Sequence, residues 1–386
     1  MKAGWQRSTI GNYCEVIAGQ SPESKYYNAD GNGIPFYQGK KGFGERFIDA
    51  PATWTTETTK TARKDDILMS VRAPVGPVNF ATDDICIGRG LAAIRSKGEL
   101  DVDFLFYQLL HLQPVIAGKE GAVFASINKS EIAALPIVFG PLPEQHRIVA
   151  LLDEAFDGIA TAKANAEKNL QNARALFESH LQSVFTEQGE GWKLKTLEQI
   201  ATTFGRGKSR HRPRNAPHLY GGKYPFIQTG DIRNANHVIT EYSQTYSEAG
   251  LAQSKLWPKG TICITIAANI AETAILGFDA CFPDSVIGVV ANPKEADVDF
   301  IEYLLQSFKD RIQSLGKGSA QANINLGTFE NERFPFPSVA EQKQFVTKLD
   351  ALHDETQRLE SIYQQKLTAL DDLKKSLLHQ AFSGQL

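Results

Sequence analysis

The chain has 386 residues, of which 42% are hydrophobic and 22% are charged, and its formal net charge is −3. These values are ordinary for a folded protein and exclude intrinsic disorder and fibrous repeats, and the length corresponds to two or three domains of roughly 150 residues. The most apolar stretch, residues 262–271, is much shorter than the roughly 20 residues that span a membrane, so we expect no membrane segment.

The N-terminus has no apolar leader, which predicts a cytoplasmic location. The four cysteines (Cys14, Cys86, Cys263 and Cys281) form no CxxC pair. This spacing argues against a zinc ribbon and against a disulfide framework, and favours reduced thiols.

The sequence contains one long internal repeat. The motif DVDF begins at Asp101 and again at Asp297, and Trp5 matches Trp192. The offset between matching residues is 187 at the tryptophans, 196 at DVDF and 197 from Asn128 and Asn325 onward. A repeat of this length indicates domain duplication. Insertions fall only in the first part of each half, which is therefore expected to be rich in loops.

The first globular region, residues 1–140, is predicted to be a mixed α/β domain. Residues 66–71 form an apolar run typical of a strand, and residues 104–112 a helix for which Asp101 is a plausible N-cap. The sequence GxGxxA at 88–93 is interpreted as a tight turn before a strand. Asn128 and its counterpart Asn325 are expected to be turn or cap residues.

A long helix follows, within residues 141–188. No proline interrupts residues 144–185, and apolar or small residues recur at spacings of three and four. At 1.5 Å per residue this helix would be roughly 63 Å long. A narrow apolar stripe of this length needs a partner to cover it.

The second globular region, residues 189–337, repeats the first pattern, and residues 338–386 repeat the long helix. Runs at 260–266 and 285–290 are typical of strands, and residues 300–315 are predicted to be one helix that Asp297 caps. Ser338 and Glu341 have the spacing of a capping box, and Gly384 follows the helix as a C-cap. We expect the two long helices to pair as an antiparallel coiled coil; the alternative is that each packs on its own globular region.

Positive charge is concentrated locally. Residues 202–235 contain seven basic side chains against the single acid Asp231, and the first region has a weaker basic group in a glycine-rich loop. Such loops suit phosphate and base-edge contact, although a charge run is more often a solvated surface. Gln38 and Gln228 occupy matching positions and could read bases or be buried hydrogen-bonding groups. The candidate DNA-contacting residues are Gln38, Lys40, Lys41, Arg46, Arg72, Arg89, Arg206, Lys208, Arg210, Arg212, Arg214, Gln228 and Arg233.

Motifs of catalysis are missing from the sequence. Residues 205–209 resemble the end of a P-loop, but position 202 is threonine and Pro213 prevents the helix that should follow. There is no HExxH, no GxSxG, no adenine-methyltransferase motif and no His/Cys cluster with metal spacing. We therefore expect a non-catalytic recognition subunit, with neither catalytic residues nor a metal or cofactor site. The alternative is a coiled-coil adaptor that binds proteins through two globular ends.

The stretch Leu135–Val149, which contains PLPEQ and enters the long helix, resembles the central region of the specificity (S) subunit of type I restriction–modification systems. The helix end FSGQL and the segments 70–76 and 87–90 also resemble this family. The resemblance covers nearly the whole chain. It implies an α+β fold in which two target-recognition domains (1–140 and 189–337) are separated by two long antiparallel helices (141–188 and 338–386).

The resemblance also implies a function. Each target-recognition domain would read one half of a bipartite, asymmetric double-stranded DNA site, and the helices would set the spacing. The helices would also dock two methyltransferase (M) subunits, which bind S-adenosylmethionine and methylate adenine. ATP-driven restriction (R) subunits are an optional further partner, and ATP and magnesium would belong to partner subunits.

Overall fold

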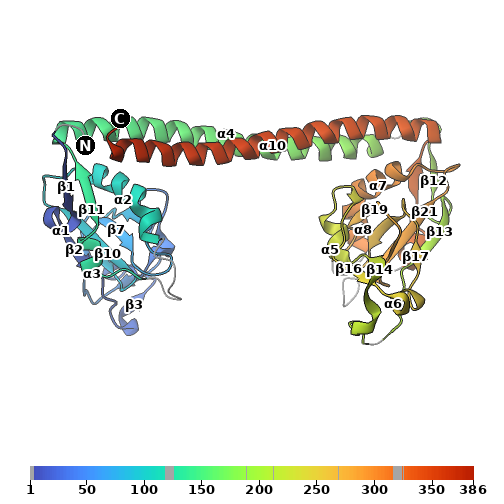
Figure 1. Cartoon of the computed structure of the whole chain (residues 1–386), viewed down its shortest axis with the longest axis horizontal. Helices are drawn as coiled ribbons and strands as arrows, with labels where there is room; N and C mark the ends of the chain where they lie inside the picture. Colours follow the sequence, from blue (N-terminus) through green and yellow to red (C-terminus); the bar gives the residue numbers. More distant parts are fainter. Residues whose placement is uncertain are drawn as a thin grey trace. The chain divides into compact units, whose positions relative to one another are not determined.

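The computed structural model describes residues 4–117, 126–187, 189–211, 213–267, 269–315, 324 and 326–386. The chain forms two compact units. The first is Met1–Glu167 with Gln364–Leu386, and the second is Lys168–Tyr363. Each unit therefore combines one globular region with part of each of two long helices (Figure 1).

The globular region of the first unit contains three small sheets. A four-stranded antiparallel sheet has the order β2-β10-β7-β8, a mixed five-stranded sheet has the order β3-β5-β4-β9-β6, and β1 pairs with β11. The strands are β1 (Gln6–Thr9), β2 (Cys14–Ala18), β3 (Tyr27–Asn28), β4 (Ile34–Tyr37), β5 (Trp54–Thr55), β6 (Thr61–Ala62), β7 (Ile67–Ser70), β8 (Val78–Phe80), β9 (Ile85–Ile87), β10 (Leu91–Ser96) and β11 (Pro136–Phe139). The helices are α1 (Ile10–Tyr13), α2 (Val102–Ala117) and α3 (Lys129–Ala133), with 3-10 turns η1 (Ser24–Tyr26) and η2 (Lys40–Gly42).

The second unit repeats this plan. Its five-stranded sheet has the order β13-β21-β18-β19-β15, its four-stranded sheet the order β16-β14-β20-β17, and β12 pairs with β22. The strands are β12 (Lys193–Lys195), β13 (Ala201–Arg206), β14 (Tyr220–Phe226), β15 (Val238–Ile239), β16 (Gln244–Tyr246), β17 (Leu256–Trp257), β18 (Ile262–Thr265), β19 (Thr273–Leu276), β20 (Ala280–Cys281), β21 (Val286–Ala291) and β22 (Phe334–Phe336). The helices are α5 (Thr229–Asn234), α6 (Glu248–Ala252), α7 (Val298–Ser307), α8 (Lys309–Leu315) and α9 (Leu326–Glu330), with the 3-10 turn η3 (Pro217–Leu219).

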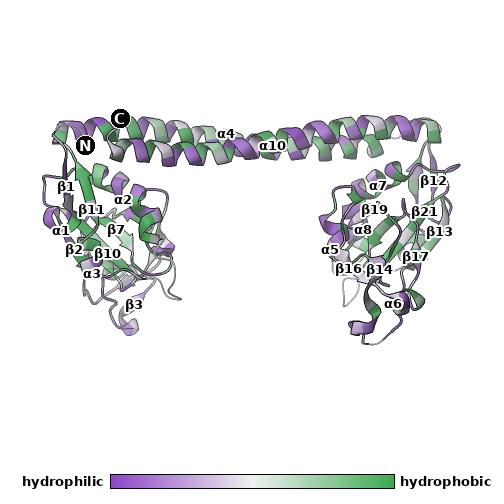
Figure 2. Ribbon diagram, in the orientation of Figure 1, coloured by the Kyte–Doolittle hydropathy of each residue, from purple (hydrophilic) through white to green (hydrophobic). Residues whose placement is uncertain are grey.

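Apolar central strands explain why each region folds. All four residues of β7 and all four of β18 are buried, and the helix that begins at DVDF packs its aromatic side chains onto them. Phe104 and its counterpart Phe300 are both fully buried. In Figure 2 β7 is green, whereas green and purple alternate along the long helices. A helix with mixed faces must cover its apolar stripe against something else.

The two long helices, α4 (Leu142–Thr186) and α10 (Val339–Ser383), pair antiparallel within each unit. In the first unit Lys163 Nζ lies 2.8 Å from Asp371 Oδ1, and in the second Arg174 Nε lies 2.9 Å from Glu360 Oε2. From the first pair to the second, the residue number on α4 increases from 163 to 174 while the number on α10 decreases from 371 to 360. The prediction of an antiparallel helix pair is therefore confirmed.

The ends of the long helices also pack on the globular regions, so the alternative prediction holds for part of their length. In the first unit Ile148 of α4 and Phe382 of α10 join the core around Phe104. In the second unit Phe185 of α4 occupies the matching place against Phe300, with ring centroids 5.3 Å apart. Each globular region is thus covered by the start of one long helix and the end of the other.

One helix prediction was wrong. Residues 300–315 form two helices, α7 and α8, rather than one. Helix α7 ends at Ser307, whose carbonyl accepts a hydrogen bond of 2.7 Å from Gln182 Nε2 on α4, and Phe308 separates α7 from α8. In the first unit, α2 is longer than predicted, at Val102–Ala117, and contains Pro114.

The predicted helix caps are confirmed. Asp101 Oδ1 accepts from the backbone N–H of Phe104, and Asp297 Oδ1 accepts from that of Phe300. Ser338 and Glu341 form the capping box of α10, and Asn128 caps α3. Asn325 lies outside the described residues.

Candidate nucleic-acid interface

Three segments cross at one point in the first unit. Strand β4 runs parallel to β9, with Phe36 opposite Cys86, and the chain then leaves both strands on the same side. Gly88 N donates to the carbonyl of Tyr37 at 2.8 Å, and Gly19 N donates to that of Leu91 at 2.9 Å. We call the turns at 19–21, 38–42 and 88–90 the first crossing.

Glycine is required at this crossing because the backbones touch. A Cβ on Gly88 would lie 2.9 Å from Gln38 Cα, and one on Gly90 would lie 2.4 Å from the carbonyl oxygen of Gln38. A Cβ on Gly19 would lie 2.2 Å from the carbonyl oxygen of Gly88. The GxG motif at 88–90 is therefore a close-approach turn before β10, as predicted.

The first crossing gathers most of the cations predicted for this region. Lys40 and Lys41 form η2, directly after Gln38, and Arg89 is the tip of the glycine turn. Arg72 joins them because Val71 N donates to the carbonyl of Gly90 at 3.0 Å. The side chains Gln38, Lys40, Lys41, Arg72 and Arg89 are all exposed. Among the described residues no carboxylate forms an ion pair with the two lysines or the two arginines of this group. Their charges can therefore bind DNA phosphates.

Arg46 does not belong to this group. Its guanidinium forms ion pairs of 2.7 Å with Asp103 on α2 and with Asp153 on α4. Burial alone would lower the pKa of Arg46, but the hydrogen bonds to both carboxylates outweigh it and raise the pKa. A guanidinium held by two carboxylates is not available for DNA, and we leave Arg46 out of the candidate interface.

The second unit has a similar crossing, in which part of the backbone hydrogen bonding recurs, although Pro283 stands where Gly88 does and has no N–H to donate. Phe226 of β14 lies opposite Cys281 of β20 in a parallel pair. Gly207 N donates to the carbonyl of Val286 at 2.9 Å, and Lys208 N donates to that of Phe282 at 3.1 Å. The turns at 207–211, 228–230 and 282–285 form the second crossing. It differs in its tip, where Asp284 stands at the position of Arg89.

Cations surround this tip. Arg206 Nε donates to the carbonyl of Asp284 at 2.7 Å, and Arg214 Nη2 lies 2.8 Å from the Asp284 carboxylate. Lys208 and Arg210 are exposed, and no described carboxylate forms an ion pair with either. The second crossing therefore presents four cations around one carboxylate.

The two residues that follow α6 fix the backbone of the basic loop. Gln253 Oε1 accepts hydrogen bonds from the N–H groups of Arg210 and His211, and Ser254 Oγ donates to the carbonyl of Lys208. A further cation, Lys255, lies over the Trp257 ring. Burial and the nearby Lys208 ammonium lower the pKa of Lys255, as a concentrated positive potential should. Lys255 was not predicted as a member of this group because it lies far along the chain from the other cations.

The two glutamines and the other predicted arginines differ in where they lie. Gln228 is half-buried, and its side chain donates to Gln244 Oε1 at 2.7 Å, whereas Gln38 is exposed. Arg233 instead lines a groove of about 1030 Å³ beside α4 and α8. Arg212 lies outside the described residues.

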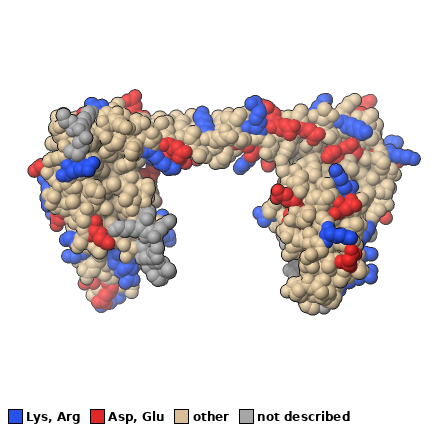
Figure 3. All heavy atoms as spheres, viewed as in Figure 1, with Lys and Arg blue, Asp and Glu red and all other residues tan. Residues whose placement is uncertain are grey.

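On the face shown in Figure 3, basic and acidic atoms are interspersed on both units, in keeping with a net charge of −3. The positive groups at the crossings are therefore local features. Within the described residues no three His, Cys, Asp or Glu side chains are grouped as metal ligands. No described helix is long and apolar enough to cross a bilayer.

Known proteins share both the sequence pattern and the fold. Residues 2–171 and 189–369 match the family model of the type I restriction modification DNA specificity domain. A putative type I restriction enzyme specificity subunit, MjaX of Methanocaldococcus jannaschii, is 41% identical over 174 residues. That alignment covers 44% of this chain and 40% of MjaX, so it spans less than half of the relative.

Two solved structures have the same fold over the whole chain. One comes from a study of complex assembly and conformational transition of a type I R-M system; it has a TM-score of 0.84 and 17% identity, and the match covers 100% of this chain and 99% of that one. The HsdS subunit from Thermoanaerobacter tengcongensis has a TM-score of 0.65 and 17% identity, with 100% and 98% coverage. Together with the two family-model matches, these findings show that the chain belongs to the type I restriction modification DNA specificity domain family.

Proposed function

We propose that this chain is the non-catalytic DNA-specificity subunit of a type I restriction–modification complex. Each globular region reads one half of an asymmetric, bipartite double-stranded site, acting in the cytoplasm. The observation that supports this most is the pair of crossings. They share one backbone scaffold but carry different side chains at the tip, Arg89 and Asp284, as two readers of different half-sites would.

The long helices complete the proposal. The start of α4 and the end of α10 are buried against one globular region, which fixes that region on the helix pair. A globular region fixed in this way can hold its half-site at a set spacing, because the distance between two DNA-binding units determines the distance between the half-sites they bind. We propose that the helices also dock two methyltransferase subunits, which supply S-adenosylmethionine chemistry, and that restriction subunits with ATP and magnesium join the complex.

In this proposal the DNA contacts come from Gln38, Lys40, Lys41, Arg72 and Arg89 at the first crossing. At the second crossing they come from Arg206, Lys208, Arg210, Arg214 and Gln228. Exposed lysines bind phosphates, whereas an arginine at a turn tip can bind guanine with two hydrogen bonds.

Neutralising the second crossing tests this assignment. In the Lys208→Ala/Arg210→Ala variant, we expect the slope of log K against log salt to fall by about 2, because each lost phosphate contact removes about 0.9. The measurement is fluorescence anisotropy of labelled duplex DNA at several salt concentrations, with the methylating partners present. Lys343→Ala/Lys348→Ala, which removes the same charge from exposed positions of α10, is the control. An unchanged slope in the first variant would remove the second crossing from the interface.

A further inference from the structure

Each unit holds one cation at the same backbone position. Phe80 N donates to the carbonyl of Arg46 at 2.8 Å, and Ile275 N donates to the carbonyl of His237 at 2.9 Å. In both units the next residue bridges to the same strand in parallel. Phe47 pairs with Phe80 of β8, and Val238 pairs with Ile275 of β19. Arg46 and His237 are therefore structural equivalents, although their side chains differ.

In the first unit the cation connects three elements. The Arg46 guanidinium contacts Asp103 of α2 and Asp153 of α4, both at 2.7 Å, and Tyr107 Oη at 3.0 Å. The Tyr107 ring faces it at 5.3 Å, and Tyr107 Oη also donates to Asp153. One side chain thus ties the loop after the first crossing to the DVDF helix and to a long helix.

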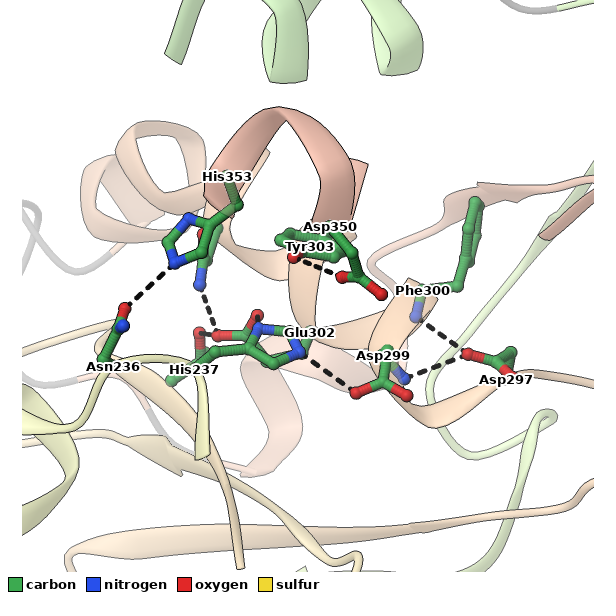
Figure 4. A network of polar contacts seen from close by, with 11 residues as sticks. Asn236, His237, Asp297, Asp299, Phe300, Glu302, Tyr303, Asp350 and His353 are labelled. Atoms are coloured by element: carbon green, nitrogen blue, oxygen red, sulfur yellow. Dashed lines mark hydrogen bonds and ion pairs between the residues drawn. The ribbon is translucent and has the colours of Figure 1, made fainter. Parts of the chain in front are cut away.

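In the second unit the histidine contacts the DVDF helix directly and reaches the long helix through Tyr303 (Figure 4). His237 Nε2 lies 3.0 Å from Asp299 Oδ1, and Nδ1 lies 2.7 Å from the fully buried Glu302 carboxylate of α7. The imidazole stacks on Tyr303, whose hydroxyl donates to Asp350 of α10 at 2.7 Å.

The partners of the two cations also occupy matching positions. Asp103 and Asp299 are the second aspartates of the two DVDF motifs, and Tyr107 and Tyr303 follow them at the same distance. Asp153 and Asp350 stand at equivalent places in the long helices. The duplicated chain thus keeps a carboxylate, a tyrosine and a long-helix aspartate around each cation, while the cation itself differs.

The segments between crossing and cation follow directly after Gln38 and Gln228, two of the proposed DNA contacts. Residues 39–45 contain Lys40 and Lys41, and residues 229–236 contain α5. Each segment is fixed at one end by the crossing and at the other by the cation. If the side chain of the cation is released, the backbone hydrogen bonds at Arg46 and His237 remain, but the segment loses its side-chain link to the long helix and its position relative to that helix is less fixed.

We propose that Arg46 and His237 are positioning residues for half-site reading. Each links the segment before it, residues 39–45 or 229–236, to the long helices of its own unit; we call this link the tie. Loss of one tie weakens discrimination at that unit's half-site and leaves the other half-site unchanged. The inference rests on the proposed DNA-reading function.

The two ties respond differently to pH. Burial alone would lower the pKa of His237, but the carboxylates of Asp299 and Glu302 beside the two ring nitrogens outweigh it and raise the pKa to about 10. The other titratable groups around it are Tyr303 on α7, Asp350 through Tyr303, and His353 through Asn236.

The folded pKa of His237 lies above the unfolded value of about 6.5. The stabilising free energy of this tie is therefore fully present below pH 6.5 and is lost as pH rises through about 10. Each pH unit in this window weakens the tie by up to about tenfold. The guanidinium tie stays charged throughout, because arginine titrates only above about pH 12.

The test is selection of bound sequences from a random duplex DNA library by the full-length chain with its methylating partners. At pH 7 we expect Arg46→Gln to reduce discrimination at one half-site at least fivefold, with the other half-site unchanged within twofold. Arg46→Lys should restore part of this loss, and His237→Gln should affect only the opposite half-site. Arg174→Gln, which removes a cation from an exposed helix–helix ion pair, is the control and should change neither.

The pH profile separates positioning from stability alone. Between pH 7 and pH 10, a range that reaches the folded pKa of His237, the wild type should lose discrimination at the half-site of the second unit, severalfold more than at the other. His237→Arg should abolish this difference, and Arg46→His should transfer pH sensitivity to the first half-site. If the wild type selects two half-sites and these variants leave both unchanged at either pH, the inference is wrong. If the wild type selects no bipartite sequence, the proposed function itself is wrong.

Discussion

Replacing Gln145 with leucine is expected to lower the free energy of unfolding by about 3–5 kcal/mol, because three backbone groups lose the partner that this buried side chain provides. Gln145 is 1% exposed. Its Oε1 accepts from Asp101 N at 2.8 Å, and its Nε2 donates to the carbonyls of Gly140 and Glu99. The side chain thereby joins the start of α4 to the start of α2.

The second unit provides an internal repeat of this experiment. Gln342 is fully buried, accepts from Asp297 N at 2.8 Å and donates to the carbonyls of Pro337 and Glu295. Gln342→Leu should therefore cost a similar amount. Urea unfolding followed by circular dichroism measures the loss, and hydrogen exchange of the Asp101 and Asp297 amides locates it. Gln171→Leu, at an exposed position of α4, is the control; equal losses in all three variants would contradict this role.

Replacing Gly207 with alanine is expected to destabilise the second unit by about 2–4 kcal/mol and to displace the basic loop. The added Cβ would lie 2.3 Å from the carbonyl oxygen of Phe282 and 2.4 Å from that of Pro283. These are backbone atoms, so the strands must move apart and the hydrogen bonds of the crossing must lengthen. DNA affinity should fall with stability, since Lys208 and Arg210 follow directly.

The control for this variant is two residues away. Gly205 lies in the same strand, β13, but a Cβ placed there meets nothing within 4 Å. Gly205→Ala should leave both thermal unfolding and DNA affinity nearly unchanged. Gly207→Ala with wild-type unfolding would show that the second crossing is not as tightly packed as described.

The duplication and the long helices could be predicted because their signals are local and periodic. DVDF, the Glu-Gln pair at the start of each long helix and the apolar stripes are short patterns that recur at a nearly constant offset. The sequence could not reveal what the repeated glutamine does, because Gln145 bonds to Asp101, which lies far from it along the chain.

The candidate site was predicted less well, because charge alone does not show what a cation contacts. Lys40, Lys41 and Arg89 meet at a crossing formed by strands that are distant in sequence, as Arg206, Lys208 and Arg210 do in the other unit. In the sequence Arg46 looks like the other basic residues of this loop, but in the structure Asp103 and Asp153 hold its guanidinium. Its equivalence to His237 is visible only in backbone hydrogen bonds, since insertions separate the halves there and the residue types differ.

The most direct test of the account is a methylation map of genomic DNA from cells that contain the methylating partners, with and without this chain. We predict methylated adenines in a two-part, asymmetric sequence with an unread gap, present only when the chain is present. The Arg89→Ala variant should relax one part of that sequence and leave the other intact. An identical methylation pattern with and without the chain would contradict the account.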